Sequence, residues 1–300
     1  MRNIDKDKIR FNFAVDCDVL LNLSLIAEGK TPRINNAVMS KAIFKLWKMV
    51  YEGDVKLYIT PQILCELGRF NPQYDERMAS REFAFVLPDI AKFVRTYCYP
   101  IYIKPNKELE FKRRAKELAL RYVDEAGFEC SVLKRKNGKE ITVPSKDAKA
   151  LAEASLCGLS FLTCNSKDFI ATVQESGAFI SDKLNNVIKI NKKFGLGYKK
   201  EDCAWTDCPV PMSVTNFIKN LPDCYMDTPF LKDTNYYVQD LLPSEVDAIS
   251  KAYYVKLNKF LKSMESGEIE ATEYGIKHPY WFRKNVKDNQ GNDIEEIVKF

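Results

Sequence analysis

The chain has 300 residues, of which 46% are hydrophobic and 29% charged, with a formal net charge of +5. This composition is typical of a soluble globular protein with a real core, either one large domain or one domain with an extension. No apolar run approaches the ~20 residues that span a bilayer, and the charged N-terminal stretch lacks the apolar region of a secretory signal. We therefore expect a cytoplasmic protein with no membrane partner.

Histidine and cysteine usage narrows the chemistry further. His278 is the single histidine, so any mechanism that pairs Ser or Cys with His would depend on it. The nine cysteines are scattered, and we expect reduced, mostly buried thiols. A structural zinc site is the alternative, and its ligands would be Cys203, Cys208, Cys224 and His278. The spacing of the first two is at the loose edge of zinc patterns and the other two are remote, which favours free thiols.

The first predicted unit is a strand followed by a helix. Phe11–Val15 forms a buried apolar run, and Val19–Ala27 continues as an apolar helix. Asp16 and Asp18 lie at the junction between them. Each of these carboxylates has two interpretations at this stage, as a helix N-cap or as a functional group at the end of a strand.

The second unit repeats this arrangement. The pattern predicts a helix over Asn35–Glu52, a strand over Val55–Thr60 and a new helix with Pro61 at its first position. Glu66 lies at the margin of the apolar face of that helix. Its carboxylate is either solvated at the rim or directed into a cleft.

The middle of the chain predicts further helices and one strand. Arg81–Tyr97 is a helical stretch, Pro100–Lys104 a third strand and Glu108–Gly127 a long helix. Two adjacent arginines of the long helix, Arg113 and Arg114, are candidate contacts for a nucleic-acid backbone.

A β-hairpin with an Asn137-Gly138 turn is predicted over Phe128–Pro144. Its tip is strongly basic and contains Lys134, Arg135 and Lys136. One interpretation is an exposed, solubilising turn. The other is an arm that contacts phosphates beside the acidic residue that follows in the chain.

The stretch from Ser145 to Phe169 organises the rest of the chain. Ser145 caps a predicted helix whose first turn holds Asp147, and Gly158 occupies the C-cap position. Leu159–Thr163 is a short buried strand, followed by Asn165 and Asp168. In a parallel α/β sheet, the start of a helix and the end of the next strand lie at the same edge, where ligands bind.

After Phe169 we expect a helix-like segment and a last strand over Asn186–Ile190. Alternating strands and helices predict a three-layer α/β/α sandwich with a mostly parallel sheet. We place this domain at residues 1–200.

From about Cys203 onward prolines recur, and one long helix is predicted over Ser244–Met264. Residues 201–300 are therefore expected to form a mainly helical extension. Its aromatic residues, Tyr280, Trp281 and Phe282, favour core or docking contacts over base stacking.

Four carboxylates fall at or just after the C-terminal ends of predicted strands. If the fold gathers them, each negative charge raises the pKa of the others unless a cation neutralises them. A hard divalent ion such as Mg²⁺ or Mn²⁺, bound through oxygen ligands, is the usual solution. The four are Asp16, Glu66, Asp147 and Asp168.

Three motifs resemble the PIN-domain nucleases: FAVDCDVLLNLSL, YITPQILCELGRF and SKDAKALAEASLCGLSFLTCNSKDF. The resemblance implies a compact α/β/α sandwich and metal-dependent cleavage of RNA. The four carboxylates match the metal-binding positions. Asn165 matches the polar residue beside them and Thr163 the supporting hydroxyl. Asp18 departs from the usual Asn or Ser, and it could add a ligand or serve as a cap.

Small bacterial PIN nucleases are often toxins held inactive by an antitoxin, and this chain is longer than such toxins. An RNA substrate, an antitoxin or other inhibitory protein, and a second copy in a homodimer are the partners this implies. Two alternatives remain. One is a non-catalytic RNA- or protein-binding module with the same fold, and the other is a nuclease for DNA flaps or single strands.

Overall fold

The computed structural model describes residues 11–34, 36–69, 90, 92–94, 96–134, 137–173, 179–180, 182–199, 206–221, 237–238, 269–270, 281–287 and 293–299. Several predictions lie outside these residues. They include most of the helix over 81–97, the helix over 244–264, Tyr280, and the side chains of Arg135, Lys136, Cys203, Cys224 and His278.

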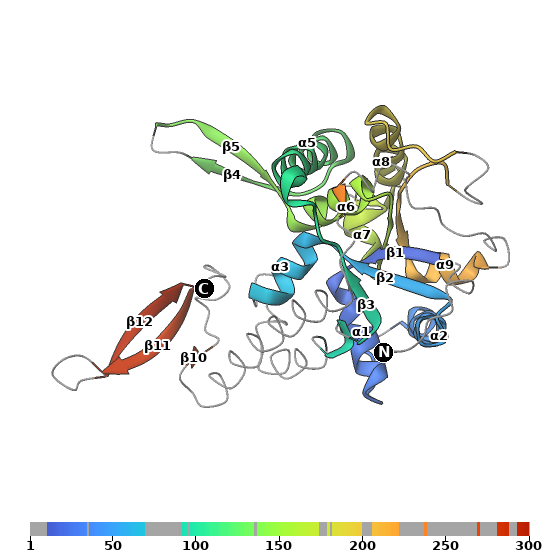
Figure 1. Cartoon of the computed structure of the whole chain (residues 1–300), viewed down its shortest axis with the longest axis horizontal. Helices are drawn as coiled ribbons and strands as arrows, with labels where there is room; N and C mark the ends of the chain where they lie inside the picture. The colour runs from blue at the N-terminus through green and yellow to red at the C-terminus, as the bar shows by residue number, and fades with distance from the viewer. Residues whose placement is uncertain are drawn as a thin grey trace.

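Five parallel strands form the central sheet, in the order β3-β2-β1-β6-β9 (Figure 1). Their bounds are β1 Phe11–Val15, β2 Val55–Ile59, β3 Cys98–Pro100, β6 Ser160–Thr163 and β9 Pro211–Ser213. The chain builds outward from β1 to β3, then returns to place β6 on the other side of β1. The sheet therefore has a topological switch point between β1 and β6, the place where ligands bind in open α/β sheets.

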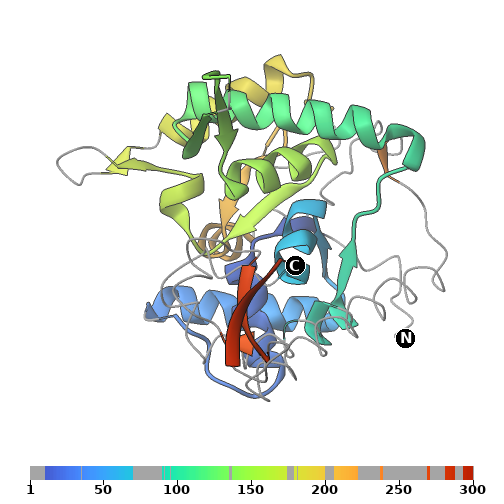
Figure 2. The same ribbon diagram turned by 90° about the vertical axis from the view of Figure 1, so that its left-hand side faces the viewer.

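Helices flank this sheet. On one side α5 packs against α6 and α8, and on the other α2 packs against α1 and α9 (Figures 1 and 2). The bounds are α1 Cys17–Ala27, α2 Ala37–Glu52, α5 Glu108–Ala126, α6 Lys146–Leu156, α8 Asp182–Lys193 and α9 Val214–Lys219. The predicted α/β class and parallel sheet are confirmed, and the arrangement is compatible with a three-layer sandwich.

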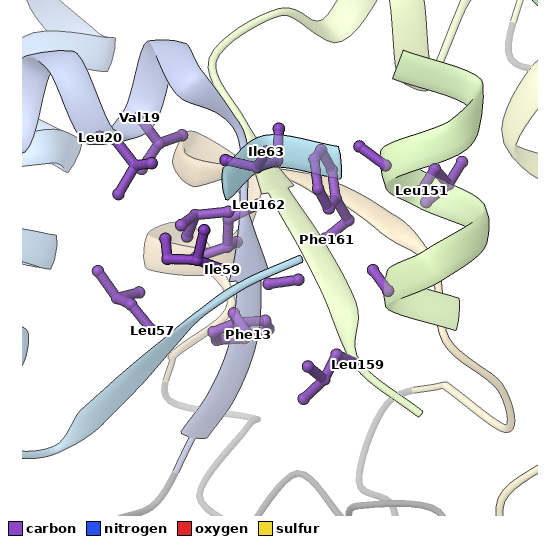
Figure 3. Packing of buried hydrophobic residues seen from close by; sticks show 14 of the residues in the cluster. Phe13, Val19, Leu20, Leu57, Ile59, Ile63, Leu151, Leu159, Phe161 and Leu162 are labelled. Atoms are coloured by element: carbon purple, nitrogen blue, oxygen red, sulfur yellow. The ribbon is translucent and has the colours of Figure 1, made fainter. Parts of the chain in front are cut away.

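The strand register sorts the core into two faces. Phe13 pairs with Leu57, and Phe13 also meets Phe217 of α9 edge-on at 4.8 Å. Phe161 lies in the next position along β6, and Figure 3 shows it beside Leu151 of α6. All four residues of β6 are buried. Strands covered on both faces need apolar residues at every position, which explains the continuous hydrophobic runs in the sequence.

The signals that predicted the two ends of α6 are confirmed, and α2 begins with a cap of the same kind. Asn36 caps α2 by accepting hydrogen bonds from the backbone of Val38 and Met39. The Ser145 side chain caps α6 by accepting from the backbone of Ala148 at 3.2 Å. Gly158 follows α6 with a φ of 70°, a left-handed conformation that glycine adopts without a steric penalty.

The predicted last strand over 186–190 is wrong, because these residues lie inside helix α8. The buried positions of α8 are Lys183, Val187, Ile190 and Asn191, which is helical spacing. The apolar run over 186–190 is too short to show this helical period by itself. The fifth strand of the sheet is instead β9, which pairs with β6 from beyond residue 200.

Of the two other predicted strand regions, the third strand needs adjustment and the hairpin does not. The third strand covers Cys98–Pro100 and not 100–104, while Ile103 forms an isolated bridge with Val238. The predicted hairpin is confirmed as β4 Cys130–Lys134 and β5 Glu140–Pro144. Its described ladder ends at the Lys134–Glu140 pair, and Asn137 and Gly138 lie in the turn, as predicted.

The remaining described strands form two small antiparallel sheets. β7 Thr172–Val173 pairs with β8 Phe179–Ile180. β10 Ile269–Glu270, β11 Trp281–Lys287 and β12 Asp293–Lys299 form a three-stranded sheet, which contains Trp281 and Phe282. None of the helices in these described ranges combines the length and hydrophobicity needed to cross a lipid bilayer.

Candidate functional site

Asp16 lies at the C-terminal end of β1, beside the switch point. It is the N-cap of α1, and its Oδ1 accepts a hydrogen bond from the backbone N–H of Cys17 at 2.7 Å. Its Oδ2 accepts from the Thr163 hydroxyl at 2.9 Å. Asp18, the other candidate for the cap, lies in the first turn of α1. Asp16 is thus both the N-cap of α1 and a candidate metal ligand.

Without a bound cation, burial and the neighbouring carboxylates together favour the protonated form of Asp16. Its side chain is 9% exposed. Burial raises the pKa of Asp16 well above its usual value, and the charges of Asp18, Asp147 and Glu66 raise it further. The Thr163 hydrogen bond acts in the opposite direction. A bound cation would relieve the repulsion.

Glu66 belongs to α3, Pro61–Arg69, and both of its carboxylate oxygens are held. Its Oε1 accepts from the Gln62 side-chain amide at 2.6 Å, and its Oε2 lies 3.5 Å from the Cys17 thiol, which donates to it. Glu66 is 7% exposed. The carboxylate is therefore directed inward, as the cleft interpretation requires.

Glu153 of α6 is an acidic residue beside Glu66 that the sequence did not single out. Its Oε2 accepts from the backbone N–H of Gln62 at 2.6 Å, at the start of α3. Burial raises the pKa of Glu153 to about 7, and Glu66 adds to the shift. Glu153 therefore joins the start of α3 to α6, the helix that carries Asp147.

Asp147 and Asp168 complete the predicted set. Burial, together with the charges of Glu66 and Asp168, raises the pKa of Asp147 to about 7. Asp168 lies in the short helix α7, Ser166–Phe169, where it accepts a hydrogen bond from the Asn165 side-chain amide. The Asn165 backbone N–H in turn donates to the Thr163 hydroxyl at 2.9 Å.

The fold thus brings the four predicted carboxylates into one electrostatic group. Asp16 is repelled by Asp147 and Glu66, and Asp147 by Glu66 and Asp168. All the donors are oxygens, which suits a hard divalent cation. Within the described residues, however, no three acidic, thiol or imidazole groups have the geometry of a ready-made metal site. The chemistry of the donors fits Mg²⁺ or Mn²⁺.

Two lysines balance this negative charge. Lys146, in the first turn of α6, is attracted by Glu66 and Asp147. Lys183 of α8 is 5% exposed, and its Nζ lies 4.2 Å from the centre of the Phe128 ring. Burial lowers the pKa of both ammonium groups, and the carboxylates oppose that shift.

The predicted nucleic-acid contacts have different environments. Arg113 is exposed on α5. Arg114 donates to the Tyr237 hydroxyl at 2.6 Å and stacks on Phe194, so it contributes to packing. Lys134 is exposed and pairs with Glu140 at 3.5 Å. These basic residues are therefore not gathered on one surface by any contact in the described structure.

Sequence reasoning missed three functional candidates: Gln62, Glu153 and Lys183. Gln62 and Glu153 occupy separate helices, and only the packing of α3 on α6 brings them together. Lys183 could have been found from its helical spacing with Val187 and Ile190, had the region been recognised as a helix.

A scan of the sequence against models of known protein families found no match, and comparisons with curated proteins and with solved structures found no similar protein. The motifs quoted above are therefore the whole basis for a family resemblance. What the site does must be argued from its own geometry and charge.

Proposed function

We propose that the protein is a metal-dependent endoribonuclease with a PIN-like fold. Mg²⁺ or Mn²⁺ would be held by Asp16, Glu66, Asp147 and Asp168. When bound, such an ion polarises a phosphodiester and lowers the pKa of an attacking water. Thr163, Asn165 and Gln62 would orient the carboxylates that hold it.

One observation carries the proposal. Four carboxylates from four different elements repel one another at the switch point of a parallel sheet. Such a concentration of negative charge opposes folding, because the carboxylates must be placed near one another and two of them, Asp16 and Glu66, must also be buried. A functional cation explains why the chain gathers them.

The test is cleavage of a panel of labelled RNA and single-stranded DNA with Mn²⁺, with Mg²⁺ and with EDTA. Asp147→Asn should lose cutting, whereas Asp124→Asn, an exposed aspartate of α5, should retain it. Cutting by Asp147→Asn at the wild-type rate would rule out this mechanism. A preference for DNA flaps or single-stranded DNA would change the proposed substrate from RNA to DNA and leave the proposed site unchanged.

A non-catalytic binding module is the second candidate, and one observation favours it. The carboxylates of Asp16 and Glu66 already accept hydrogen bonds from protein donors. This candidate predicts no heat of binding for millimolar Mn²⁺ by calorimetry, and RNA or protein binding that does not change with Asp147→Asn.

A further inference from the structure

Lys183 lies among the carboxylates, although it is distant from them in sequence. Two contacts place Lys183 there. The N–H of Leu184 donates to the carbonyl of Ile170 at 3.1 Å, which ties the first turn of α8 to the end of α7 and hence to Asp168. On the other side, Lys183 Nζ lies over the ring of Phe128.

Phe128 is itself tied to the helix of Asp147. The carbonyl of Glu129, the next residue, accepts from the backbone N–H of Ser145 at 2.9 Å, and Ser145 caps α6. Phe128 also packs edge-on against Phe169 with ring centres 6.1 Å apart. Lys183 therefore lies between the segment that presents Asp147 and the segment that presents Asp168.

The electrostatic interactions of Lys183 agree with this placement. Its ammonium is attracted first by Asp168, then by Glu129 and Asp147. A lysine with 5% exposure is unusual, because desolvating an ammonium group is costly unless negative charge or an aromatic face compensates. Here both are present, so the fold places a fixed positive charge beside the candidate metal ligands.

We infer that Lys183 is a phosphate-binding residue of this site. When a cation occupies the carboxylates, it neutralises the anions that Lys183 now faces. The ammonium group is then available to bind a non-bridging oxygen of an incoming phosphodiester. The inference rests on the proposed function for its cation and its substrate, and phosphate binding tests it separately from RNA cleavage.

Lys183→Met is the decisive variant. Methionine has a similar length and makes favourable contacts with aromatic rings, so it should pack on Phe128. Lys183→Arg keeps the charge. Lys189→Met, on the exposed side of the same helix, removes an equal charge away from the site. Binding of inorganic phosphate in the presence of Mg²⁺, followed by the shift in melting temperature, is measured for all four proteins together with single-turnover RNA cleavage.

We expect wild type, Lys183→Arg and Lys189→Met to bind phosphate. Lys183→Met should bind phosphate and cleave RNA about 10- to 100-fold less well, the effect of losing one hydrogen bond to a charged group. Its Mn²⁺ affinity should be unchanged or higher, because a competing positive charge is gone. A lysine that is merely structural would lower stability without moving phosphate affinity.

The outcomes separate the two ideas. Phosphate binding that is equal in wild type and Lys183→Met, or absent from wild type, overturns the phosphate site whether or not RNA is cut. Phosphate binding lost in Lys183→Met, in a protein that cuts no RNA or DNA, supports the phosphate site and rejects the nuclease.

Discussion

The hydroxyl of Thr163 donates a hydrogen bond to Oδ2 of Asp16 at 2.9 Å, and the two residues are 147 positions apart in the chain. Each lies at the C-terminal end of its strand, and the two strands are neighbours in the sheet. The same hydroxyl accepts from the N–H of Asn165. One completely buried oxygen thus connects the carboxylate of β1 to the loop that presents Asp168.

Thr163→Val should weaken metal binding about 10- to 100-fold, because it removes the group that orients Asp16. It also leaves the Asn165 N–H without its acceptor, at a cost of about 1–3 kcal/mol in the free energy of unfolding. Calorimetry with Mn²⁺ and urea denaturation measure the two effects. Thr163→Ser keeps the hydroxyl and should behave nearly as wild type. Equal Mn²⁺ affinity for the valine and serine variants would contradict the orienting role.

Gln62→Met should weaken metal binding while leaving α3 intact. The side-chain amide of Gln62 holds Glu66, whereas its backbone N–H, which methionine retains, is held by Glu153. Glu153→Ala should instead lower stability before it affects metal binding. It removes the acceptor at the start of α3, which costs about 1 kcal/mol in the free energy of unfolding. Mn²⁺ affinity and thermal stability are compared for both variants. Indistinguishable profiles would show that the two contacts have no separate roles.

The free energy of unfolding of the metal-free protein should fall as pH rises from about 4 to about 7. Folded Asp147 keeps its proton up to about pH 7. An unfolded aspartate loses its proton near pH 4. The folded state therefore binds more protons in this interval, and stability declines with rising pH. Urea denaturation in EDTA across this range measures the slope.

Asp147→Asn should flatten part of that slope, and added Mg²⁺ should flatten it in wild type by replacing the proton with a cation. The remainder in Asp147→Asn comes from Glu153, whose pKa is also raised to about 7, and from Asp16, whose pKa is raised well above its usual value. Identical slopes in wild type and Asp147→Asn would mean that Asp147 titrates as an ordinary surface group.

Tyr122→Phe is a control for general destabilisation. The buried Tyr122 hydroxyl bonds to Asn191 Oδ1 at 2.5 Å and lies 3.1 Å from Ser155 Oγ, so it joins α5, α6 and α8. Its removal should cost about 1–2 kcal/mol in the free energy of unfolding. Metal affinity should not change, since none of these groups contacts the carboxylates. A loss of Mn²⁺ binding in this variant would indicate that the site responds to any loosening of the helical layer.

A chain ending at residue 200 should fail to fold into a monomer. It lacks β9, which covers the edge of β6, and α9, whose fully buried Phe217 packs on Phe11 at 5.1 Å and Phe13 at 4.8 Å. An exposed apolar strand edge promotes aggregation. Size-exclusion chromatography of this fragment and of one ending at residue 240 makes the comparison. A monomeric, cooperatively folded 1–200 fragment would support the boundary expected from composition.

The carboxylate positions could be predicted because they depend on local signals. Asp16 and Asp168 follow strands whose apolar runs are unambiguous, and Asp147 follows a serine cap. The strand at 211–213 could not be predicted, since three residues carry no period and Pro211 argues against a strand interior. The roles of Gln62, Glu153 and Lys183 were missed in the sequence for another reason. Their roles arise from contacts between elements, and a single sequence does not display tertiary packing.

The pairing of β1 with β6, and of β6 with β9, also sets when the site can exist. During synthesis the ribosome delivers β1 first, but its neighbour β6 and the edge strand β9 emerge much later. Long-range parallel pairing is slow to form, because a long loop must close before any contact rewards it. The nascent chain therefore carries Asp16 without the partners that would make a metal site until Asp147 and Asp168 have been synthesised. Whatever activity the carboxylates support is acquired only after β9 has emerged.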